Sequence, residues 1–266
     1  MENFETYLQK SNLANNTIQS YTWTINEYFK KFGKIDKISL IKYKQYLLEN
    51  NKPKTVNLRL QAINKYLTYK NKADLKVKPL KLQHANFIDN VISDADYKFF
   101  CNKLKDENKI LWYFVVRFLT ATGARVGELI QIKAENIFAG YVDIYSKGGK
   151  IGRLFIPKTL KQETLIWISR INLKSGYIFL NKFGKRLTTR GIAQQLKSLA
   201  ISYGIDEKVV HPHSFRHRFA KNFLEKYNDI ALLADIMGHE SIETTRIYLR
   251  KTATEQQLLI DEIVTW

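Results

Sequence analysis

The stretch that decides the fold lies late in the chain, from His211 to Tyr248, and reads HPHSFRHRFAKNFLEKYNDIALLADIMGHESIETTRIY. It opens with closely spaced histidines and arginines, places His239 directly after a glycine, and closes on a tyrosine. Cationic and hydrogen-bonding groups that converge on one place suit an anion, and a tyrosine beside them is a potential nucleophile. We therefore predict a site that binds and attacks a phosphodiester of DNA.

Three short segments resemble the sequence boxes of the tyrosine site-specific recombinases, the phage-integrase and Xer-like family. Residues 213–217 (HSFRH) resemble its H-x-L-R-H box, and residues 237–248 (MGHESIETTRIY) its L-G-H-x-S-x-x-T-T-x-x-Y box. Residues 122–129 (TGARVGEL) match its T-G-x-R-x-x-E-L box. Met237 stands where leucine is common, which is a volume-conserving change. The boxes follow each other in the family's order, so the signal is specific.

The composition favours a nucleic-acid partner. Of the 266 residues, 43 are Lys or Arg and 25 are Asp or Glu, which gives a formal net charge of +18. The hydrophobic share of 45% excludes a disordered chain. Nucleic acid is preferred to a membrane surface because no apolar run approaches the roughly 18 residues of a spanning helix. The single Cys101 excludes disulfides within the chain and a cysteine zinc finger. We expect a cytoplasmic, nucleoid-associated protein.

Charge and periodicity divide the chain into domains. Residues 1–90 carry 16 Lys and Arg against 7 Asp and Glu. We predict a helical DNA-binding domain over residues 1–78, a linker over 79–90, a catalytic domain over 91–252 and a tail helix over 253–266. The fold class is mainly α, with a small β-hairpin in the catalytic domain. The resemblance implies that residues 1–78 correspond to the family's core-binding domain. It also implies that this domain and the catalytic domain form a C-shaped clamp around double-stranded DNA.

Helix signals are clear in the first domain. Apolar residues recur at helical spacing, with Asn15 or Asn16 as the predicted N-cap of a helix that Gly33 ends. Ser39 is the predicted N-cap of the next helix.

Basic residues lie off the apolar face of the helix that begins at Pro53. Arg59 and Lys65 are among them, and we predict that they contact DNA. The alternative is a helical bundle with ordinary solvated lysines.

Attack on a phosphodiester requires groups that stabilise its negative oxygens. Arginine suits this task because its planar guanidinium makes paired hydrogen bonds and keeps its charge. Arg125 and Arg216 are the candidates, and the resemblance implies that both are catalytic. Arg125 could instead form a structural ion pair with Glu128, three residues on. If Arg125 is catalytic, Glu128 supports the site by orienting a partner.

The resemblance implies different roles for three histidines. His213 matches the family's catalytic histidine, which assists proton transfer or binds a phosphate oxygen. His239 matches a second position, usually His or Trp, and is expected to hydrogen-bond and pack near Tyr248. His217 is expected to support the fold. His213 and His217 also stand four apart, as zinc ligands on a helix do, but Ser214 replaces the glutamate of the metalloprotease motif. We predict no metal.

Two alternating stretches, Tyr141–Tyr145 and Arg153–Pro157, predict a β-hairpin with a glycine turn. Lys147 fills the position of the family's hairpin lysine, which implies that it is the general acid for the leaving oxygen. Lys150 is the alternative for this role and a candidate DNA contact. Both could also be solvated turn lysines.

Tyr248 is one of 15 tyrosines, and its spacing also fits a core residue on a helix with Ile242, Thr245 and Leu249. The box around it implies that it is the nucleophile, whose attack leaves a 3′-phosphotyrosine and a free 5′-hydroxyl. The covalent bond preserves the phosphoester energy, so a later 5′-hydroxyl can rejoin the strand without ATP, metal or another cofactor.

We interpret the chain as a site-specific recombinase. The resemblance implies a homo-tetramer on two recombination sites, strand exchange through a Holliday junction, and a monomer when free. A type IB topoisomerase shares the chemistry but relaxes DNA as a monomer, and a non-catalytic DNA-binding regulator would not need a full set of active-site positions. The tail helix either packs on its own domain or docks into a neighbouring protomer.

Overall fold

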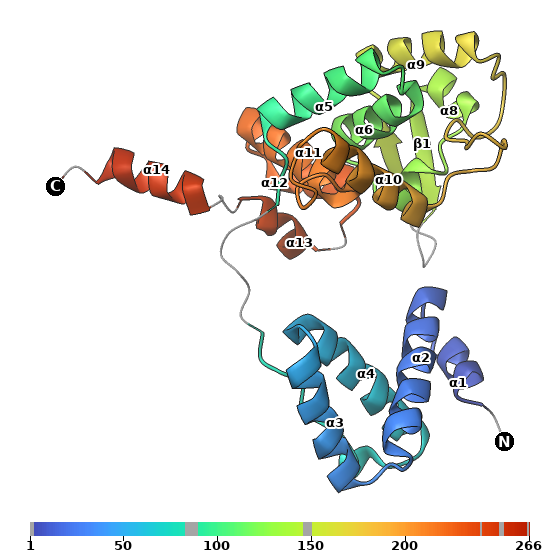
Figure 1. The fold of residues 1–266 in the computed structure, drawn as a ribbon, viewed down its shortest axis with the longest axis vertical. Coiled ribbons are helices and arrows are strands. Elements are labelled where there is room, and N and C mark those ends of the chain that lie inside the picture. Colours follow the sequence, from blue (N-terminus) through green and yellow to red (C-terminus); the bar gives the residue numbers. More distant parts are fainter. Residues whose placement is uncertain (1–2, 83–89, 146–150, 240, 250–252, 265) are drawn as a thin grey trace. The chain divides into compact units, whose positions relative to one another are not determined.

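The chain divides into two compact units, Met1–His84 and Ala85–Trp266 (Figure 1). The computed structural model describes residues 3–82, 90–145, 151–239, 241–249, 253–264 and 266. Most of these residues lie in helices, and the strands among them form one antiparallel sheet. The predicted mainly-α fold with a small β-hairpin is therefore confirmed.

The first unit is a bundle of helices around an aromatic and aliphatic core. The helices are α1 (Phe4–Lys10), α2 (Asn15–Phe32), α3 (Lys37–Asn50) and α4 (Pro53–Tyr69), followed by the short 3-10 helix η1 (Ala73–Leu75). Tyr28 and Tyr43 are buried at the centre, with their rings edge to face and 4.9 Å between centroids. Leu60 and Ile63 of α4 have no exposed surface. The periodic apolar positions of the sequence thus face one core.

The structure corrects two predicted helix caps. The N-cap of α2 is Ala14, where no side-chain hydrogen bond caps the described helix, so neither Asn15 nor the residue after it has this role. α3 begins before Ser39, because the Asp36 carboxylate accepts a hydrogen bond from the Ser39 backbone N–H at 2.8 Å. Asp36 offers a charged acceptor earlier in the chain, which extends the helix at its start. Gly33 ends α2 with a φ of 70°, as predicted.

Residues 77–80 follow η1 and are fastened to α4. The Asn64 side chain exchanges two hydrogen bonds with the backbone of Val77, both at 2.9 Å. The Asn57 side chain makes the same pair with Leu80, at 2.7 and 2.9 Å. These bonds hold Leu80 on the first unit, although the predicted linker begins before it.

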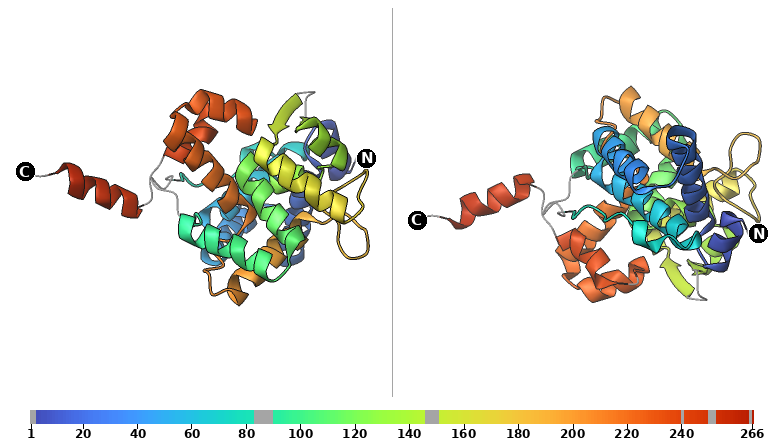
Figure 2. Two further views of the ribbon diagram at one scale, coloured as in Figure 1. Left: turned by 90° about the horizontal axis from the view of Figure 1, so that it is seen from above. Right: turned by 90° about the horizontal axis from the view of Figure 1, so that it is seen from below.

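The second unit is built around α6 (Ile110–Thr122), which is apolar on nearly all sides and buried along its centre. α5 (Asp94–Asp106), α9 (Lys158–Arg170) and α11 (Pro212–Tyr227) pack against it, and Figure 2 shows α11 beside α6. The other helices of the described ranges are α7 (Val126–Leu129), α8 (Ala134–Ala139), α10 (Thr189–Ser202), α12 (Ile230–Met237), α13 (Ile242–Arg246), η2 (Ile247–Leu249) and α14 (Ala253–Ile263). Within the described part of the chain, no helix is long and apolar enough to cross a membrane.

The predicted hairpin is present as β1 (Tyr141–Tyr145) and β2 (Ile151–Phe155), paired antiparallel with Asp143 opposite Arg153. β2 begins earlier than the alternating pattern indicates. Arg153 Nε donates to Asp143 Oδ1 at 2.8 Å, and the Arg153 guanidinium lies over the Tyr141 ring at 3.9 Å. This cross-strand pair stabilises the hairpin in the observed register.

Candidate active site

Arg125 lies in the turn between α6 and α7. Gly123 ends α6 with a φ of 65°, and Arg125 is the N-cap of α7. One carboxylate oxygen of Glu128 accepts a hydrogen bond from the Arg125 backbone N–H and the other from Arg125 Nη1, both at 2.7 Å. The ion pair considered from the sequence is therefore present. The Arg125 side chain keeps 43% of its surface exposed, so a ligand can reach its guanidinium.

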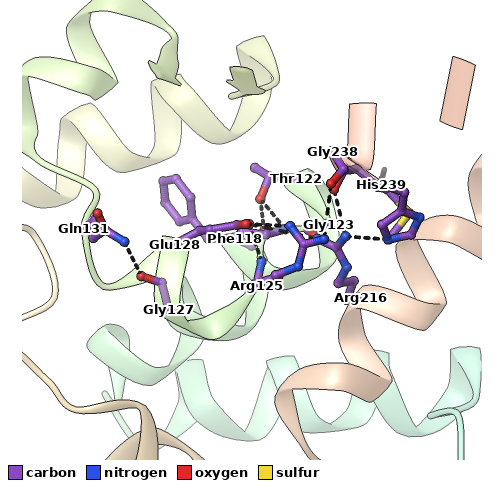
Figure 3. A network of polar contacts seen from close by, with 12 residues as sticks. Phe118, Thr122, Gly123, Arg125, Gly127, Glu128, Gln131, Arg216, Gly238 and His239 are labelled. Atoms are coloured by element: carbon purple, nitrogen blue, oxygen red, sulfur yellow. Dashed lines mark hydrogen bonds and ion pairs between the residues drawn. The ribbon is translucent and has the colours of Figure 1, made fainter. Parts of the chain in front are cut away.

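Arg216 reaches the same place from α11, but only 4% of it is exposed. Its Nη1 donates to the Gly123 carbonyl, and its Nη2 donates to the Met237 carbonyl and to His239 Nε2, each of the latter two at 2.9 Å. A Glu128 carboxylate oxygen lies 3.9 Å from Nη1. Figure 3 shows the guanidinium groups of the two arginines next to each other. Carbonyl partners are neutral, so they hold Arg216 without cancelling its charge.

Gly123 permits this arrangement for two reasons. Its positive φ favours glycine, and a Cβ at this position would lie 2.4 Å from Phe219 Cδ1. Phe219 is on α11, close to Arg216 along the helix. The close approach of α11 to the end of α6 therefore requires a residue without a side chain.

Burial lowers the pKa of Arg216, and the charge of Arg125 lowers it further. Tyr248 and Glu128 act in the opposite direction, and Tyr248 does so partly through a side-chain hydrogen bond. An arginine starts from so high a pKa that it stays charged. The Tyr248 side chain lies beside this group, because its ring packs against that of His239, which is hydrogen-bonded to Arg216.

His239 is held as a neutral imidazole. Arginine has only donors, so His239 Nε2 accepts the hydrogen bond from Arg216, and Nδ1 must carry the proton. Nδ1 then donates to Thr245 Oγ1 at 2.7 Å, and Thr245 has no exposed surface. Burial, followed by the charges of Arg216 and Arg125, lowers the pKa of His239 to about 4. In this arrangement His239 is a hydrogen-bond acceptor for Arg216.

Tyr248 is 8% exposed and belongs to a small core with Leu233 and Met237. Its ring lies parallel to the His239 ring, with an interplanar angle of 13° and 6.0 Å between centroids. The His217 ring meets it edge-on at 5.1 Å. Tyr248 is therefore a core residue, as its helical spacing allowed. It also lies beside the site, as the box around it implied.

His213 lies in the first turn of α11 and is exposed. With Arg125 and Arg216 it lines a cavity of about 360 Å³ between this turn and the α6–α7 turn. Glu128, Gln131 and Pro212 also line it. The cavity presents cationic and hydrogen-bonding side chains to one ligand, as an anion requires.

His217 lies on the inner side of α11. Burial, followed by the charges of His213, His211 and Arg216, lowers the pKa of His217 to about 4. It is in ring contact with Tyr248, so it contributes to the packing around that residue. Across the described residues, no three His, Cys, Asp or Glu side chains group as metal ligands do.

The two strands of the hairpin border the site. Ile144, Gly152 and Leu154 line a small second pocket together with Arg125 and Arg216. Lys147 and Lys150 lie in residues 146–150, outside the described residues.

Arg59 and Lys65 lie on α4 in the first unit. The Arg59 guanidinium lies over the Trp23 ring at 4.1 Å, and its Nη1 donates to Thr24 Oγ1 at 2.7 Å. Lys65 Nζ lies 5.1 Å from the centroid of the Tyr7 ring. Trp23 is 51% exposed, so Arg59 and Trp23 together form a cationic aromatic patch on the surface.

Sequence reasoning did not identify Thr245 or the backbone groups that hold the arginines. Thr245 was considered only as a core residue, but it also fixes the tautomer of His239. The carbonyls of Gly123 and Met237 bind Arg216, and that of Gly238 lies 3.4 Å from Arg125 Nη2. The glycines of the two boxes were the available signal, because a glycine marks a place where the backbone approaches another group.

The site joins two guanidinium groups, a solvent-facing imidazole and a tyrosine hydroxyl. The sequence model of the phage integrase family matches residues 90–255. The chain therefore belongs to the phage integrase family.

Individual relatives show which members of the phage integrase family the chain resembles. Tyrosine recombinase XerA of Thermococcus kodakarensis is 26% identical over 279 residues, which cover 99% of this chain and 97% of XerA. TnP I resolvase of Bacillus thuringiensis is 29% identical over 270 residues, with 92% and 93% covered. These relatives confirm the resemblance to tyrosine recombinases of the Xer type, which are enzymes.

A solved structure supports the fold. The XerH site-specific recombinase, bound to difH substrate in a pre-cleavage complex, aligns with a TM-score of 0.70 at 19% identity. The alignment covers 96% of this chain and 81% of XerH.

Proposed function

We propose that the chain is a site-specific DNA recombinase that cleaves and rejoins DNA strands through a 3′-phosphotyrosine at Tyr248 and a Holliday junction. The observation that carries this proposal is the convergence of Arg125, Arg216 and His213 on one cavity, beside a tyrosine whose ring packs against His239, the hydrogen-bond partner of Arg216. Family membership and the recombinases among the relatives support the same activity. The substrate in the XerH complex supports DNA as the partner.

In the proposed reaction the Tyr248 hydroxyl oxygen attacks phosphorus. A bond forms between this oxygen and phosphorus, and the bond from phosphorus to the 5′-oxygen breaks. Arg125 and Arg216 bind the non-bridging oxygens, whose negative charge grows in the transition state. His213 takes the tyrosine proton, and Lys147 gives a proton to the leaving 5′-oxygen. Attack by a 5′-hydroxyl reverses these steps, so neither ATP nor metal is needed.

The other residues act through these groups. Glu128 holds the Arg125 guanidinium at 2.7 Å, and His239 accepts a hydrogen bond from Arg216 at 2.9 Å. His239 and His217 also contact the Tyr248 ring, which they orient from two sides. Their neutral imidazoles leave the positive charge of the site to the arginines.

We further propose that both units bind one DNA duplex as a C-shaped clamp. Residues 1–78 serve as the core-binding domain, residues 79–90 as the linker and residues 91–252 as the catalytic domain. Arg59 and Lys65 contact DNA from the first unit and Lys150 from the hairpin turn. The basic composition supports this, because phosphate contacts dominate the affinity of proteins for DNA.

The active assembly in this proposal is a homo-tetramer on two sites, formed from free monomers. Tail residues 253–266 include α14, in which Leu258, Ile260 and Ile263 are 62%, 55% and 60% exposed. An apolar surface of this kind on a short helix suits docking into a neighbouring protomer. The proposed site of action is cytoplasmic DNA in the nucleoid.

The decisive variant is Tyr248→Phe. Only a hydroxyl is removed, so the variant should bind DNA as the wild type does and form no covalent adduct. The substrate is a nicked suicide duplex that carries the sequence selected by the protein from a random library, and denaturing gels reveal the adduct. Undiminished adduct in the variant would move the nucleophile to another residue.

A further inference from the structure

Residues 90–94, near the start of the second unit, are bound to α11. Ile92 is 2% exposed, and its backbone N–H donates to Ser214 Oγ at 2.8 Å in the interior. Ser214 has no exposed surface. Asp94, at the start of α5, pairs with Nη1 of Arg218. The Arg218 guanidinium also lies over the Tyr97 ring at 4.5 Å, so α11 holds this segment through both a buried and a charged contact.

A third contact involves the N-cap of α11. His211 Nδ1 accepts a hydrogen bond from the Ser214 backbone N–H at 3.2 Å. Burial lowers the pKa of His211, as does the charge of His213, whereas hydrogen bonds with the backbone of Asn90 and Lys208 oppose this change. The same imidazole therefore caps α11 and interacts with the backbone of Asn90.

The two sides of α11 have different partners. Ser214 and Arg218 are four residues apart and lie on one side of the helix. Each residue turns the helix by about 100°, so Arg216 points to roughly the opposite side. Arg216 is bound there to Gly123 and Met237. α11 thus lies between residues 90–94 and the site that contains Arg125 and Arg216.

Small displacements of α11 change the rate of the proposed reaction. A misplacement of about 1 Å can reduce the rate of a reaction roughly 100-fold when reacting groups must be aligned. His213 and Arg216 are both on α11, so they move together if the helix shifts or rotates. A contact that fixes α11 from its far side therefore controls the geometry of the cavity.

We propose that Ser214 and Arg218 are positioning residues, which tie the position of His213 and Arg216 to residues 90–94, near the start of the second unit. The inference rests on the proposed function and names residues outside its cavity that hold two of its groups in place. The Ile92–Ser214 and Asp94–Arg218 contacts fix α11 from the side opposite to Arg216, so loss of either contact displaces both groups.

The test uses Asp94→Ala in the full chain, because the Asp94 side chain is 71% exposed and its removal opens no core. The matched control is Glu207→Ala, which removes another carboxylate of the second unit, paired with Lys197 at 3.0 Å. We expect Asp94→Ala to slow single-turnover cleavage roughly tenfold, with unchanged affinity for the same duplex. Arg218→Lys keeps a cation opposite Asp94 and should lose less. Equal cleavage rates in Asp94→Ala and Glu207→Ala would overturn the proposal.

Hydrogen exchange of the free protein tests the anchor without using activity. The amides of residues 213–218 should exchange faster in Asp94→Ala than in the wild type or Glu207→Ala. Unchanged exchange there would also overturn the proposal. If the wild type forms no adduct but the exchange differs as expected, the proposed function fails while the anchor stands.

Discussion

The α6–α7 turn and α11 each supply one arginine to the site, but they hold it differently. Arg125 is half exposed and is held by the Glu128 carboxylate. Arg216 is buried and is held mainly by the carbonyls of Gly123 and Met237. The charge of Arg125 is therefore accessible and partly neutralised by Glu128. The charge of Arg216 is buried and held in one position by the surrounding backbone.

The two arginines therefore contribute differently to the proposed function and to the stability of the fold. A ligand can form hydrogen bonds with the Arg125 guanidinium without disturbing the core. Arg216 also ties the end of α6 to the end of α12, because Gly123 and Met237 belong to those ends. We conclude that Arg216 serves both the fold and the proposed chemistry, and Arg125 mainly the chemistry.

The largest expected effect comes from replacing each arginine by alanine. Both variants should form adduct roughly 10²–10³-fold more slowly, because each loses a group that stabilises the transition state. Arg216→Ala should also lower the free energy of unfolding by about 3 kcal/mol, since buried carbonyls lose their donor. Arg125→Ala should lower it by less than about 1 kcal/mol. Urea unfolding measures this, and equal losses would contradict the comparison.

A smaller effect is expected at the contact that brings the two regions together. Gly123→Ala should lower the free energy of unfolding by roughly 1–3 kcal/mol, from backbone strain and from the clash with Phe219. Gly204→Ala is the matched control, because Gly204 has a φ of 68° and no atom within 4 Å of an added Cβ. The difference between the variants isolates the clash. No difference would mean that α11 can move away from the turn at little cost.

A pH dependence is expected on the α11 side. The pKa of His239 is lowered from 6.5 to about 4, so the folded state binds fewer protons than the unfolded state between these values. Its contribution to stability is present above pH 6.5 and is lost as the pH falls toward 4. His217 behaves in the same way. His239→Gln should reduce the fall in unfolding free energy over this range, and an unchanged fall would exclude a neutral His239 in the fold.

Local patterns predicted much of this molecule. The apolar period of the helices in the first unit, the glycine that ends α2 and the hairpin alternation were readable because they depend on neighbours in sequence. The three boxes also gave Arg125, Arg216 and Tyr248, which the structure brings around one site. The predicted caps at Asn15 and Ser39 failed, because nearby residues already determined where those helices begin.

Long-range partners could not be predicted. The Arg216 bond to Gly123 spans 93 residues and the Ile92 bond to Ser214 spans 122. Such bonds depend on how helices pack, and a single sequence carries no direct signal of that packing. Thr245 illustrates the limit, since its helical spacing indicated only a core position, while its hydroxyl binds His239.

The most direct test of the account is to identify the tyrosine that carries the DNA. Adduct trapped on the nicked duplex is digested with nuclease and protease, and the modified peptide is sequenced by mass spectrometry. The account predicts a 3′-phosphonucleotide on Tyr248, although this residue is only 8% exposed and Tyr227 is 72% exposed. A nucleotide on Tyr227 or any other tyrosine would contradict it.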